Sequence, residues 1–307
     1  MSSTVVLVNP ASANGSTGRR WPQLAQRAAA AGLDGDALFS ERPGHLGELA
    51  RAAALAGAEL LVVVGGDGSV HEVANGLAGL AKPPELAIIP RGTGWDFART
   101  FGIPREVGAA VEVALRGAVR TIDLGRVVYR AWDGQEAEAV FANVASAGMS
   151  GAVAQRANRS TKSLGGKASY LWATLAVFSG WSAVEADIVV DDEVRHGRMF
   201  DVVVANGCFF GGGMKMCPQA EPDDGLFDVV TIGDVTKRDL VATMPKIYRG
   251  THLPHPKAEA LRGRTVSIAT SVAVPLQLDG EHPGTTPCRF EVLAAALRLR
   301  VPLPVAG

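Results

Sequence analysis

Residues 60–77 read LLVVVGGDGSVHEVANGL, and this stretch decides the fold. The five apolar residues at 60–64 are typical of a buried parallel strand, and the apolar positions 70, 73, 74 and 77 predict an amphipathic helix directly after it. The glycines between them allow a tight turn and let an anion approach the backbone, while the helix N-terminus offers N–H groups to phosphate. Asp67 would repel a bare phosphate, so the stretch indicates a Mg²⁺-nucleotide site. A plain connection between strand and helix stays an open alternative.

Composition limits the classes of protein to consider. The chain has 307 residues, of which 47% are hydrophobic and 20% charged, so we expect a globular protein of two domains. The formal net charge of −1 gives no global attraction to nucleic acid, and we expect no nucleic-acid partner. The three cysteines, Cys208, Cys217 and Cys288, show no CxxC spacing, which argues against disulfides and a zinc site.

We expect neither a targeting segment nor a membrane span in this sequence. Its start lacks the basic and apolar regions of a signal peptide, and its longest aliphatic and aromatic run, residues 171–178, is far shorter than the roughly 20 residues of a spanning helix. We therefore expect a cytoplasmic protein.

Strands and helices alternate in the first part of the chain. Strands are expected at 5–8, 60–64 and 86–89, and helices at 21–31, 47–56, 70–77, from about 96, and at 107–116. This order predicts an N-terminal doubly wound α/β domain, residues 1–124, with ligands at the carboxyl ends of its strands. The loops 9–18, 65–69 and 91–96 each follow a strand and should face one crevice.

Strand patterns dominate the second part, residues 125–307. They predict a mostly antiparallel β-sandwich domain, with the last residues packing back on the first domain. The expected strands are 126–129, 139–144, 186–190, 200–205, 227–232, 265–269, 275–278, 289–293 and 297–301, with one helix near 166–180.

Five motifs in a fixed order resemble the diacylglycerol kinase catalytic-domain family, which includes bacterial lipid kinases and sphingosine kinases. The motifs are VNPAS at 8–12, GGDGS at 65–69, PRGTGWDFAR at 90–99, FFGGGM at 209–214 with PQAEPDDGL at 218–226, and LDGE at 278–281. The resemblance covers about residues 5–300. It implies an NAD-kinase-like α/β domain followed by the β-sandwich.

The resemblance also implies roles for individual residues. Asp279 deprotonates the acceptor hydroxyl with Glu281 in support, and Asp96 and Asp123 link the metal and its water to that base. The catalytic Mg²⁺ binds at Asp67. The nucleotide contacts fall on Asn9, Pro10, Ser12, Gly65, Gly66, Asp67, Gly68, Ser69, Glu72, Gly92, Thr93 and Gly94.

Several of these residues have an ordinary structural interpretation as well. Asp-Gly is a common hairpin turn, so residues 279–280 could serve as a hairpin, and Asp96 could cap a helix. Arg19 or Arg20 could assist phosphate binding or be solvated. The absence of a GxxxxGK[ST] sequence excludes a Walker-type kinase.

A second, structural Mg²⁺ is implied at the acidic loop. There Asp224 provides a side chain, and Glu221 and Leu226 provide main-chain carbonyls, although an ordinary acidic turn is the alternative. One departure from the family pattern is Trp95, which stands where the family carries Asn. Because indole only donates a hydrogen bond, the polar contact that the family makes there must be altered, which leaves nucleotide geometry and nucleotide choice open. Trp95 could instead stack on the base or on lipid.

The preferred function is an ATP-dependent lipid kinase acting on diacylglycerol, with ATP as co-substrate and Mg²⁺ as cofactor. The alternatives are a kinase for sphingoid or other lipids, a nicotinamide-dinucleotide kinase and a catalytically silent binding protein. Basic residues at 156–167, followed by the aromatic run 170–178 and Trp181, suit reversible contact with the inner face of a membrane, or a core helix. A homodimer is left open.

Overall fold

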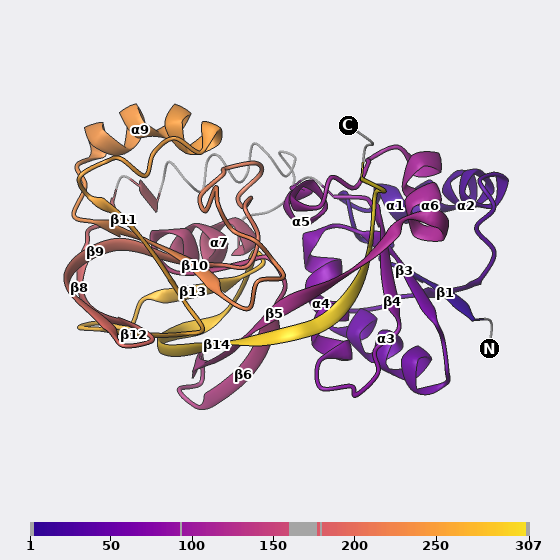
Figure 1. The fold of residues 1–307 in the computed structure, drawn as a ribbon, viewed down its shortest axis with the longest axis horizontal. Helices are drawn as coiled ribbons and strands as arrows, with labels where there is room; N and C mark the ends of the chain where they lie inside the picture. Colours follow the sequence, from indigo (N-terminus) through magenta and orange to yellow (C-terminus); the bar gives the residue numbers. More distant parts are fainter. Residues whose placement is uncertain (1–2, 93, 160–176, 179, 305–307) are drawn as a thin grey trace. The chain divides into compact units, whose positions relative to one another are not determined.

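The computed structural model describes residues 3–92, 94–159, 177–178 and 180–304, with the backbone alone at 157–159. The chain divides into two units (Figure 1). Unit 1 comprises Met1–Asp123 with Ala295–Gly307, and unit 2 comprises Leu124–Ala294. The chain passes from unit 1 to unit 2 along strand β5 (Ala118–Ala131) and returns along β14 (Glu281–Val301). The fold class expected from the sequence, α/β followed by a β-sandwich, is confirmed.

Unit 1 is built around a parallel sheet. Its strand order is β14-β4-β3-β1-β2, and the run 60–64 forms the central strand β3 with both neighbours parallel to it. The remaining bounds are β1 (Thr4–Val8), α1 (Ser16–Arg19), α2 (Trp21–Ala30), β2 (Asp36–Phe39), α3 (His45–Leu55), β3 (Leu60–Gly65), α4 (Asp67–Leu77), β4 (Glu85–Pro90), α5 (Asp96–Thr100) and α6 (Val107–Arg116).

Helices cover both faces of this sheet (Figure 1). Alternate residues of β1, β3 and β4 pack against α2 and α6 in one core, and the opposite face is covered by α3 and α4. Both faces of β3 are buried, which explains its uninterrupted apolar sequence. The expected strands and helices of this unit are present, whereas the short edge strand β2 and helix α1 were not predicted.

Two glycines set the contact between α3 and α4. A Cβ atom on Gly76 would lie 2.1 Å from the carbonyl oxygen of Gly47, and one on Gly47 would lie 2.6 Å from that of Glu72. Since both obstacles are backbone atoms, the helices can approach this closely only with glycine at the crossing.

We therefore expect Gly76→Ala to lower the free energy of unfolding by about 3 kcal/mol, because overpacking of a rigid contact is strongly destabilising. Chemical denaturation measures this change. The matched control is Gly108→Ala in α6, where the new Cβ would lie 3.1 Å from the carboxylate of Glu106, which caps α6 through the N–H of Ala109. Because a side chain rather than backbone must shift, this variant should lose less stability than Gly76→Ala, and equal losses in both variants would contradict the explanation.

Unit 2 is an antiparallel β-sandwich with one long helix on its outside. Its central strand β9 pairs with β7, β8 and β10, and β14 pairs with β13 and β12. The inner faces of these strands form one core. The remaining bounds are β6 (Glu136–Phe141), β7 (Val144–Gly148), α7 (Met149–Arg159), β8 (Val184–Val190), β9 (Glu193–Ala205), β10 (Phe227–Gly233), α9 (Lys237–Arg249), β11 (Ala258–Gly263), β12 (Thr265–Thr270) and β13 (Pro275–Leu278).

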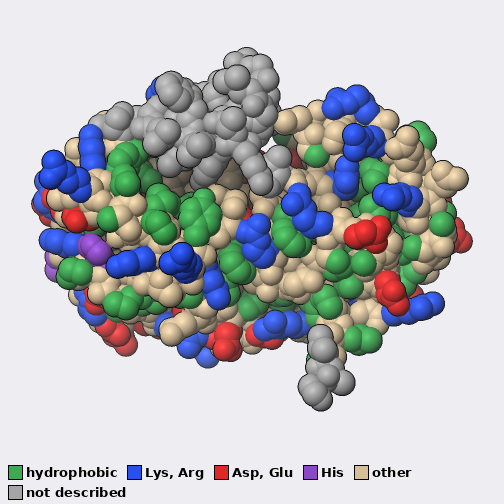
Figure 2. All heavy atoms as spheres, turned by 90° about the horizontal axis from the view of Figure 1, so that it is seen from above, with side chains coloured by type: hydrophobic (Ala, Val, Ile, Leu, Met, Phe, Trp, Pro, Cys, Tyr) green, Lys and Arg blue, Asp and Glu red, His purple; other side chains and the backbone are tan. Residues whose placement is uncertain are grey.

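The helices of unit 2 differ from the expectation. The helix expected near 166–180 lies almost wholly outside the described residues, and α7 and α9 were not predicted. The sequence signal of α9 is weak because Pro245 stands inside it. Leu240 and Ile247 of α9 pack on the outer face of β7, β9 and β10. Figure 2 shows Lys, Arg and hydrophobic side chains intermixed on the side of unit 2 that carries α9.

Strand β14 is one element of 21 residues, although the sequence indicated two separate strands at 289–293 and 297–301. The apolar run around Ala295 does not alternate, and Ala295 itself has a positive φ of 53°. This break in the pattern marks the point where β14 leaves unit 2. Beyond it, Arg298 and Leu299 pair with β4, and Glu85 accepts from Arg298 and Arg300, both at 2.6 Å.

Candidate active site

Three loops meet at the carboxyl ends of β1, β3 and β4 in unit 1. Asn9 Nδ2 donates to Ser69 Oγ at 2.9 Å, which ties the loop after β1 to the first turn of α4. Gly66 and Gly92 bring the other two loops together, since a Cβ on Gly92 would lie 2.7 Å from Gly66 Cα. The structure therefore places these predicted phosphate loops side by side, and glycine is required where their backbones touch.

The loop after β1 is held by its own side chains. Asn9 Oδ1 accepts from the N–H of Ala11 at 3.0 Å, and Ser12 Oγ lies 2.9 Å from Asn9 O and 2.6 Å from Thr17 Oγ1. A Cβ on Gly18 would lie 2.9 Å from Pro10 Cβ, so the loop folds back on itself at this point. These contacts fix the shape of the loop, which suits an anion site.

Two carboxylates face the same point beside Gly94. A Cβ atom built on Gly94 would lie 2.6 Å from Asp67 Oδ2 and 3.6 Å from Asp96 Oδ2. Asp67 Oδ1 accepts from the N–H of Phe97 at 3.0 Å, and Asp96, which is buried, begins α5 and lies 3.4 Å from an Arg99 nitrogen. Thr93, in the same loop, lies outside the described residues.

This pair fits the donor set of a nucleotide-bound Mg²⁺. Such an ion uses one or two carboxylates, with phosphate oxygens and water in its other positions. Across the described part of the chain no group of three or more Asp, Glu, His or Cys side chains could hold a metal by itself. A site in which phosphate oxygens complete the coordination of the ion agrees with the pair of carboxylates and with the lack of a larger group of ligands among the described residues.

Three arginines surround the same loops. Burial, together with repulsion from Arg20 and Arg105, lowers the pKa of Arg91, and Arg105 donates to the carbonyl of Gly92 at 3.1 Å. Among the described residues, no carboxylate forms an ion pair with any of the three, and the buried Nε of Arg91 has no hydrogen-bond partner. Clustered guanidinium groups without acids are an arrangement that binds a polyanion.

The sequence analysis considered Arg20 but missed Arg91 and Arg105. Arg91 stands inside the quoted glycine-rich motif, and its charge there was a usable signal. Arg105 is separated from that motif by helix α5, so only the fold brings it back to Gly92.

Trp95 occupies an unusual position in this loop. Its backbone is left-handed, with φ of 60°, a conformation that Asn adopts far more readily than Trp. The guanidinium groups of Arg99 and Arg105 lie over its ring, at 5.3 and 5.2 Å, and its buried Nε1 has no partner in the described structure. Stacking of a base on this ring, as the sequence suggested, would have to displace an arginine.

Two predicted site residues of unit 1 have clear structural contacts. Glu72 Oε2 accepts from the N–H of Leu46 at 3.1 Å and so caps the start of α3. The buried Asp123 accepts from the N–H of Ala295 at 2.7 Å and ties β5 to the returning strand β14. A nucleotide contact of Glu72 and a catalytic role of Asp123 stay predictions.

In unit 2, Asp279 and Gly280 form the two-residue turn between β13 and β14. Leu278 pairs with Glu281 across the turn, and both turn residues have positive φ, of 51° and 93°. The hairpin interpretation of Asp-Gly is therefore correct for the backbone. Glu281 is exposed at the start of β14.

The carboxylate of Asp279 is held by three backbone N–H groups. Oδ2 accepts from Ala142 at 2.8 Å, and Oδ1 accepts from Asn143 and Val144 at 2.9 and 3.1 Å. The turn itself is braced because Gly280 N donates to Gln277 Oε1 at 2.8 Å. These three bonds orient the carboxylate of Asp279, and they also fix the segment between β6 and β7.

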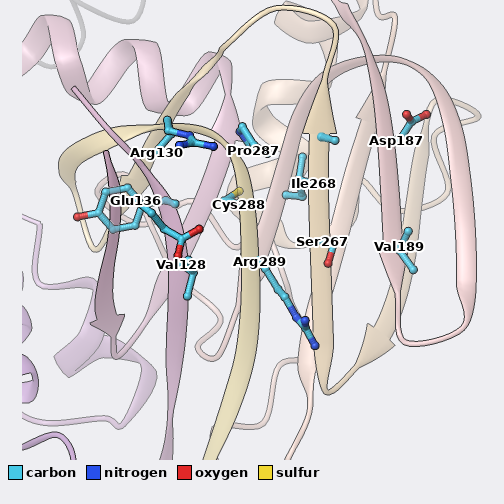
Figure 3. Close-up of a pocket in the computed structure, with 12 residues that line it drawn as sticks. Val128, Arg130, Glu136, Asp187, Val189, Ser267, Ile268, Pro287, Cys288 and Arg289 are labelled. Atoms are coloured by element: carbon cyan, nitrogen blue, oxygen red, sulfur yellow. The ribbon is translucent and has the colours of Figure 1, made fainter. Parts of the chain in front are cut away.

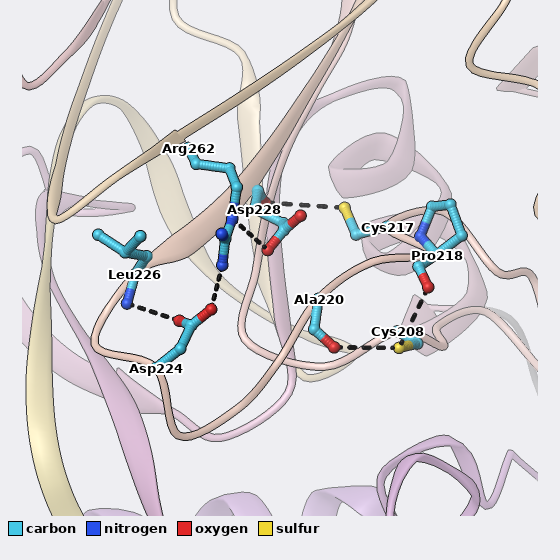
Figure 4. A network of polar contacts seen from close by, with 8 residues as sticks. All are labelled: Cys208, Cys217, Pro218, Ala220, Asp224, Leu226, Asp228 and Arg262. Atoms are coloured by element: carbon cyan, nitrogen blue, oxygen red, sulfur yellow. Dashed lines mark hydrogen bonds and ion pairs between the residues drawn. The ribbon is translucent and has the colours of Figure 1, made fainter.

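The guanidinium group of Arg262, on β11, already balances the charge of the acidic loop of unit 2 (Figure 4). The carboxylate of Asp224 pairs with Arg262 and accepts from the N–H of Leu226, and Arg262 also pairs with Asp228 at 3.3 Å. Burial raises the pKa of Asp228. This donor set does not fit an added divalent ion, because the guanidinium takes the oxygen that the ion would need.

We expect neither Mg²⁺ nor a chelator to change the melting temperature of unit 2, whereas Arg262→Met should lower its unfolding free energy by about 1 to 3 kcal/mol. Arg126→Met is the control, because Arg126 and Glu291 form an exposed pair worth less than about 1 kcal/mol. If Glu221, Asp224 and Leu226 held a structural metal ion, the chelator would lower the melting temperature.

Asp201 is a buried acid that the sequence analysis missed. Its carboxylate accepts from the N–H and the hydroxyl of Ser150 and so caps the start of α7. Burial raises the pKa of Asp201 to about 7. A single acid inside the apolar run of β9 was the only sequence signal for it.

One pocket of the described structure lies elsewhere in unit 2 (Figure 3). It has a volume of about 330 Å³ and is lined by residues of β5, β6, β8, β12 and β14, including Arg130 and Arg289. Cys288 lies beneath it, and burial raises the pKa of that thiol, which keeps it protonated. None of the predicted site residues lines this pocket.

The aromatic residues expected to contact lipid are only partly described. Residues 170–176 lie outside the described part of the chain. Phe178 and Trp181 pack against the core of unit 2, and Trp181 Nε1 donates to the carbonyl of Phe200 at 3.0 Å. For Trp181 the core interpretation is therefore correct. No helix among the described residues is long and apolar enough to cross a membrane.

Comparison with known proteins defines the class to which this fold and site belong. Residues 3–127 match the family described as diacylglycerol kinase catalytic domain, and residues 143–301 match the YegS C-terminal NAD kinase beta sandwich-like domain. The second match covers more than half of the chain, so the chain belongs to the family of the YegS C-terminal NAD kinase beta sandwich-like domain, and its first part matches a diacylglycerol kinase catalytic domain. The two matches together make it an enzyme of a kinase family.

Individual relatives extend over almost the whole chain. The chain is 27% identical to a diacylglycerol kinase of Staphylococcus carnosus, over 98% of this chain and 95% of the relative. It is 28% identical to a diacylglycerol kinase of Bacillus subtilis, over 97% of this chain and 95% of the relative.

Solved structures agree on the fold. A diacylglycerol kinase from Bacillus anthracis superposes with a TM-score of 0.71 at 22% identity, over 97% of this chain and 96% of that one. The yeast NADH kinase complexed with NADH superposes with a TM-score of 0.51 at 12% identity, over 96% of this chain and 82% of that one. The expected NAD-kinase-like architecture is confirmed.

Proposed function

We propose that this protein is an ATP-dependent lipid kinase that transfers the γ-phosphoryl group to the hydroxyl of diacylglycerol and produces phosphatidic acid. One observation in unit 1 carries the proposal. The site suits a metal-bound triphosphate, because it combines three glycine loops in contact with one another, a group of arginines without ion-pair partners among the described residues, and two carboxylates that face one point. The names of the relatives support diacylglycerol as the acceptor.

The residues have the following proposed roles. Backbone N–H groups at residues 65–69 and 92–94 bind the triphosphate together with Arg20, Arg91 and Arg105. Asp67 and Asp96 hold Mg²⁺, which when bound neutralises charge on the phosphate oxygens.

The chemical step forms one bond and breaks one. The lipid hydroxyl oxygen attacks the γ-phosphorus, the bond to the β,γ-bridging oxygen breaks, and ADP leaves. The hydroxyl proton passes to Asp279, with Glu281 and Asp123 in supporting roles. We propose a cytoplasmic enzyme that associates reversibly with the inner face of the membrane, where this acceptor resides.

A transfer assay with labelled ATP tests the proposal against its alternatives. The acceptors are diacylglycerol, a sphingoid base and a nicotinamide dinucleotide, each offered with and without Mg²⁺. We expect label in diacylglycerol alone or most strongly. Preferential labelling of the sphingoid base or the dinucleotide would support the corresponding alternative, and no labelling at all would favour a silent binding protein.

Arg91→Gln should weaken nucleotide binding without weakening the fold. Arg91 is repelled by Arg20 and Arg105, so removal of its charge leaves the melting temperature unchanged or raises it. A charge-assisted contact to phosphate is worth about 1.5 to 3 kcal/mol, so we expect the Kd for ATP to rise by about 10-fold or more. Calorimetric titration and thermal unfolding measure the two effects.

The control for this substitution is Arg116→Gln. Arg116 is exposed and lies 3.6 Å from Glu112 on α6, so it already has an acidic partner. ATP affinity should not change in this variant. A loss of stability in Arg91→Gln with unchanged ATP affinity would show that Arg91 has a structural role only.

A further inference from the structure

Helix α9 presents a basic and apolar surface to solvent. We define its outer face as the six exposed residues Arg238, Val241, Pro245, Lys246, Tyr248 and Arg249. Arg238, Val241, Pro245 and Tyr248 follow one another at spacings of three, four and three, which places them on one side of the helix. Leu240 and Ile247 point the other way and are buried against unit 2.

The single acid of the helix does not offset this charge. Asp239 forms a capping box with Thr236, in which its carboxylate accepts from the backbone and the hydroxyl of Thr236. These bonds lower the pKa of Asp239. Its charge is therefore used at the helix N-terminus, where it stabilises the first turn.

The cations of the outer face have no acidic partners. Arg238, Lys246 and Arg249 form no ion pair with any described residue. Other cations of the same unit do find acids, as in the pair of Arg198 with Asp234 at 2.8 Å and that of Arg195 with Glu259 at 2.8 Å. Unit 2 therefore leaves the charges of Arg238, Lys246 and Arg249 available for an external anion.

Apolar side chains lie among these cations. Val241 is 65% exposed and Tyr248 50%, and Pro245 is also exposed. Because Pro245 has no N–H, the carbonyl of Val241 lacks its usual helical partner on this side. In the space-filling view, basic and hydrophobic side chains alternate over the part of unit 2 that carries α9 (Figure 2).

We propose that the outer face of α9 is a docking surface for a membrane that contains anionic lipids. The cations contact headgroup phosphates, while Val241 and Tyr248 enter the boundary between headgroups and acyl chains. The helix has 13 residues and lies on the surface of its unit, so it can rest flat on a bilayer. The proposal rests on the proposed function, because a diacylglycerol kinase must reach an acceptor dissolved in a membrane.

A bilayer fits this face better than an acidic protein. Cations that adjoin a narrow row of three apolar side chains suit a fluid surface of many phosphates. The fully buried centre of a protein interface is depleted of charged residues, whereas here Arg238, Lys246 and Arg249 adjoin the apolar row.

Sedimentation with vesicles tests the docking surface. The full chain is mixed with vesicles of phosphatidylcholine and phosphatidylglycerol, or of phosphatidylcholine alone. We expect binding to the mixed vesicles that weakens with added salt. Arg238→Glu with Arg249→Glu should reduce the affinity at least about tenfold, because each basic residue near an anionic surface contributes a factor of about five.

The matched control is Lys82→Glu with Arg289→Glu. Both residues are exposed, neither forms an ion pair with a described residue, and the change in net charge is the same. This variant should bind the mixed vesicles like the parent. Equal losses in both variants would show a net-charge effect, and no loss in the α9 variant would overturn the proposal.

A second pair of substitutions tests the apolar contribution. Val241→Ser with Tyr248→Ser should weaken vesicle binding severalfold without changing its dependence on salt. Both side chains are exposed, so the fold should be retained, which circular dichroism verifies. Unchanged binding would exclude insertion of α9 into the headgroup region.

Catalysis separates failure of this inference from failure of the proposed function. With a short-chain diacylglycerol that dissolves as monomers, the α9 variants should phosphorylate as fast as the parent, and the deficit should appear only on vesicles. If the parent protein bound vesicles through α9 but phosphorylated no lipid, the proposed function would be refuted and the docking surface would still be supported. An α9 variant that is equally impaired on the soluble lipid would contradict a docking role.

Discussion

Asp279→Asn is expected to reduce phosphoryl transfer by about 10³-fold, within the range measured for loss of a general base. The amide cannot take the proton of the lipid hydroxyl. The same substitution should also lower the unfolding free energy by about 1 to 3 kcal/mol. An amide NH₂ must now face one of the N–H groups of residues 142–144, all of which point at the carboxylate.

The two effects must be measured separately. Initial rates are taken per folded enzyme, at a temperature well below the melting transition of the variant. Asp133→Asn is the matched control, because Asp133 begins another Asp-Gly turn of unit 2 and accepts from the N–H of Gln135 at 2.9 Å. Its transfer rate should equal that of the parent. If Asp279→Asn destabilised the protein but kept the full rate, Asp279 would be a structural brace and another group would be the base.

Asp67→Asn is expected to reduce transfer by about 10²-fold or more and to leave the fold intact. The amide oxygen can still accept from Phe97 N, so the contact between α4 and α5 survives. The charge that faces Asp96 beside Gly94 is lost, and the NH₂ group is no ligand for Mg²⁺. A titration of activity with Mg²⁺ should show that the variant needs a higher concentration of the ion.

Asp34→Asn serves as the control for the loss of one negative charge, because Asp34 is exposed in the same unit. Gly94→Ala offers an independent route to the same defect. Its Cβ would lie 2.6 Å from Asp67 Oδ2 and would push the carboxylate aside. An unchanged Mg²⁺ requirement in both Asp67→Asn and Gly94→Ala would refute the assignment of the ion to this pair.

The sequence was most informative where local pattern and topology agree. The apolar run at 60–64 is buried on both faces and became the central strand, and parallel strands place their carboxyl-end loops at one edge. For this reason the loops at Asn9, Gly66 and Gly92 could be placed together without coordinates.

Contacts between residues far apart in the chain were not accessible in the same way. Nothing local to Glu72 indicates that it caps a helix beginning 27 residues earlier, and nothing near Asp123 indicates Ala295 as its donor. The pairing of Asp224 with Arg262 spans 38 residues and was missed, although a metal was inferred at the same loop. The sequence showed that negative charge gathers there, but not which cation balances it.

The path of β14 has a consequence for biosynthesis. Unit 2 is one continuous segment, so its core needs no residue beyond 294. Unit 1 is discontinuous, because the edge of its sheet beside β4 is filled by Arg298 and Leu299. Until those residues emerge, the nascent chain carries an unpaired strand edge of the kind that recruits other chains. A stop codon just before residue 295 should therefore yield a protein that aggregates through unit 1 although every glycine loop of the nucleotide site has been synthesised.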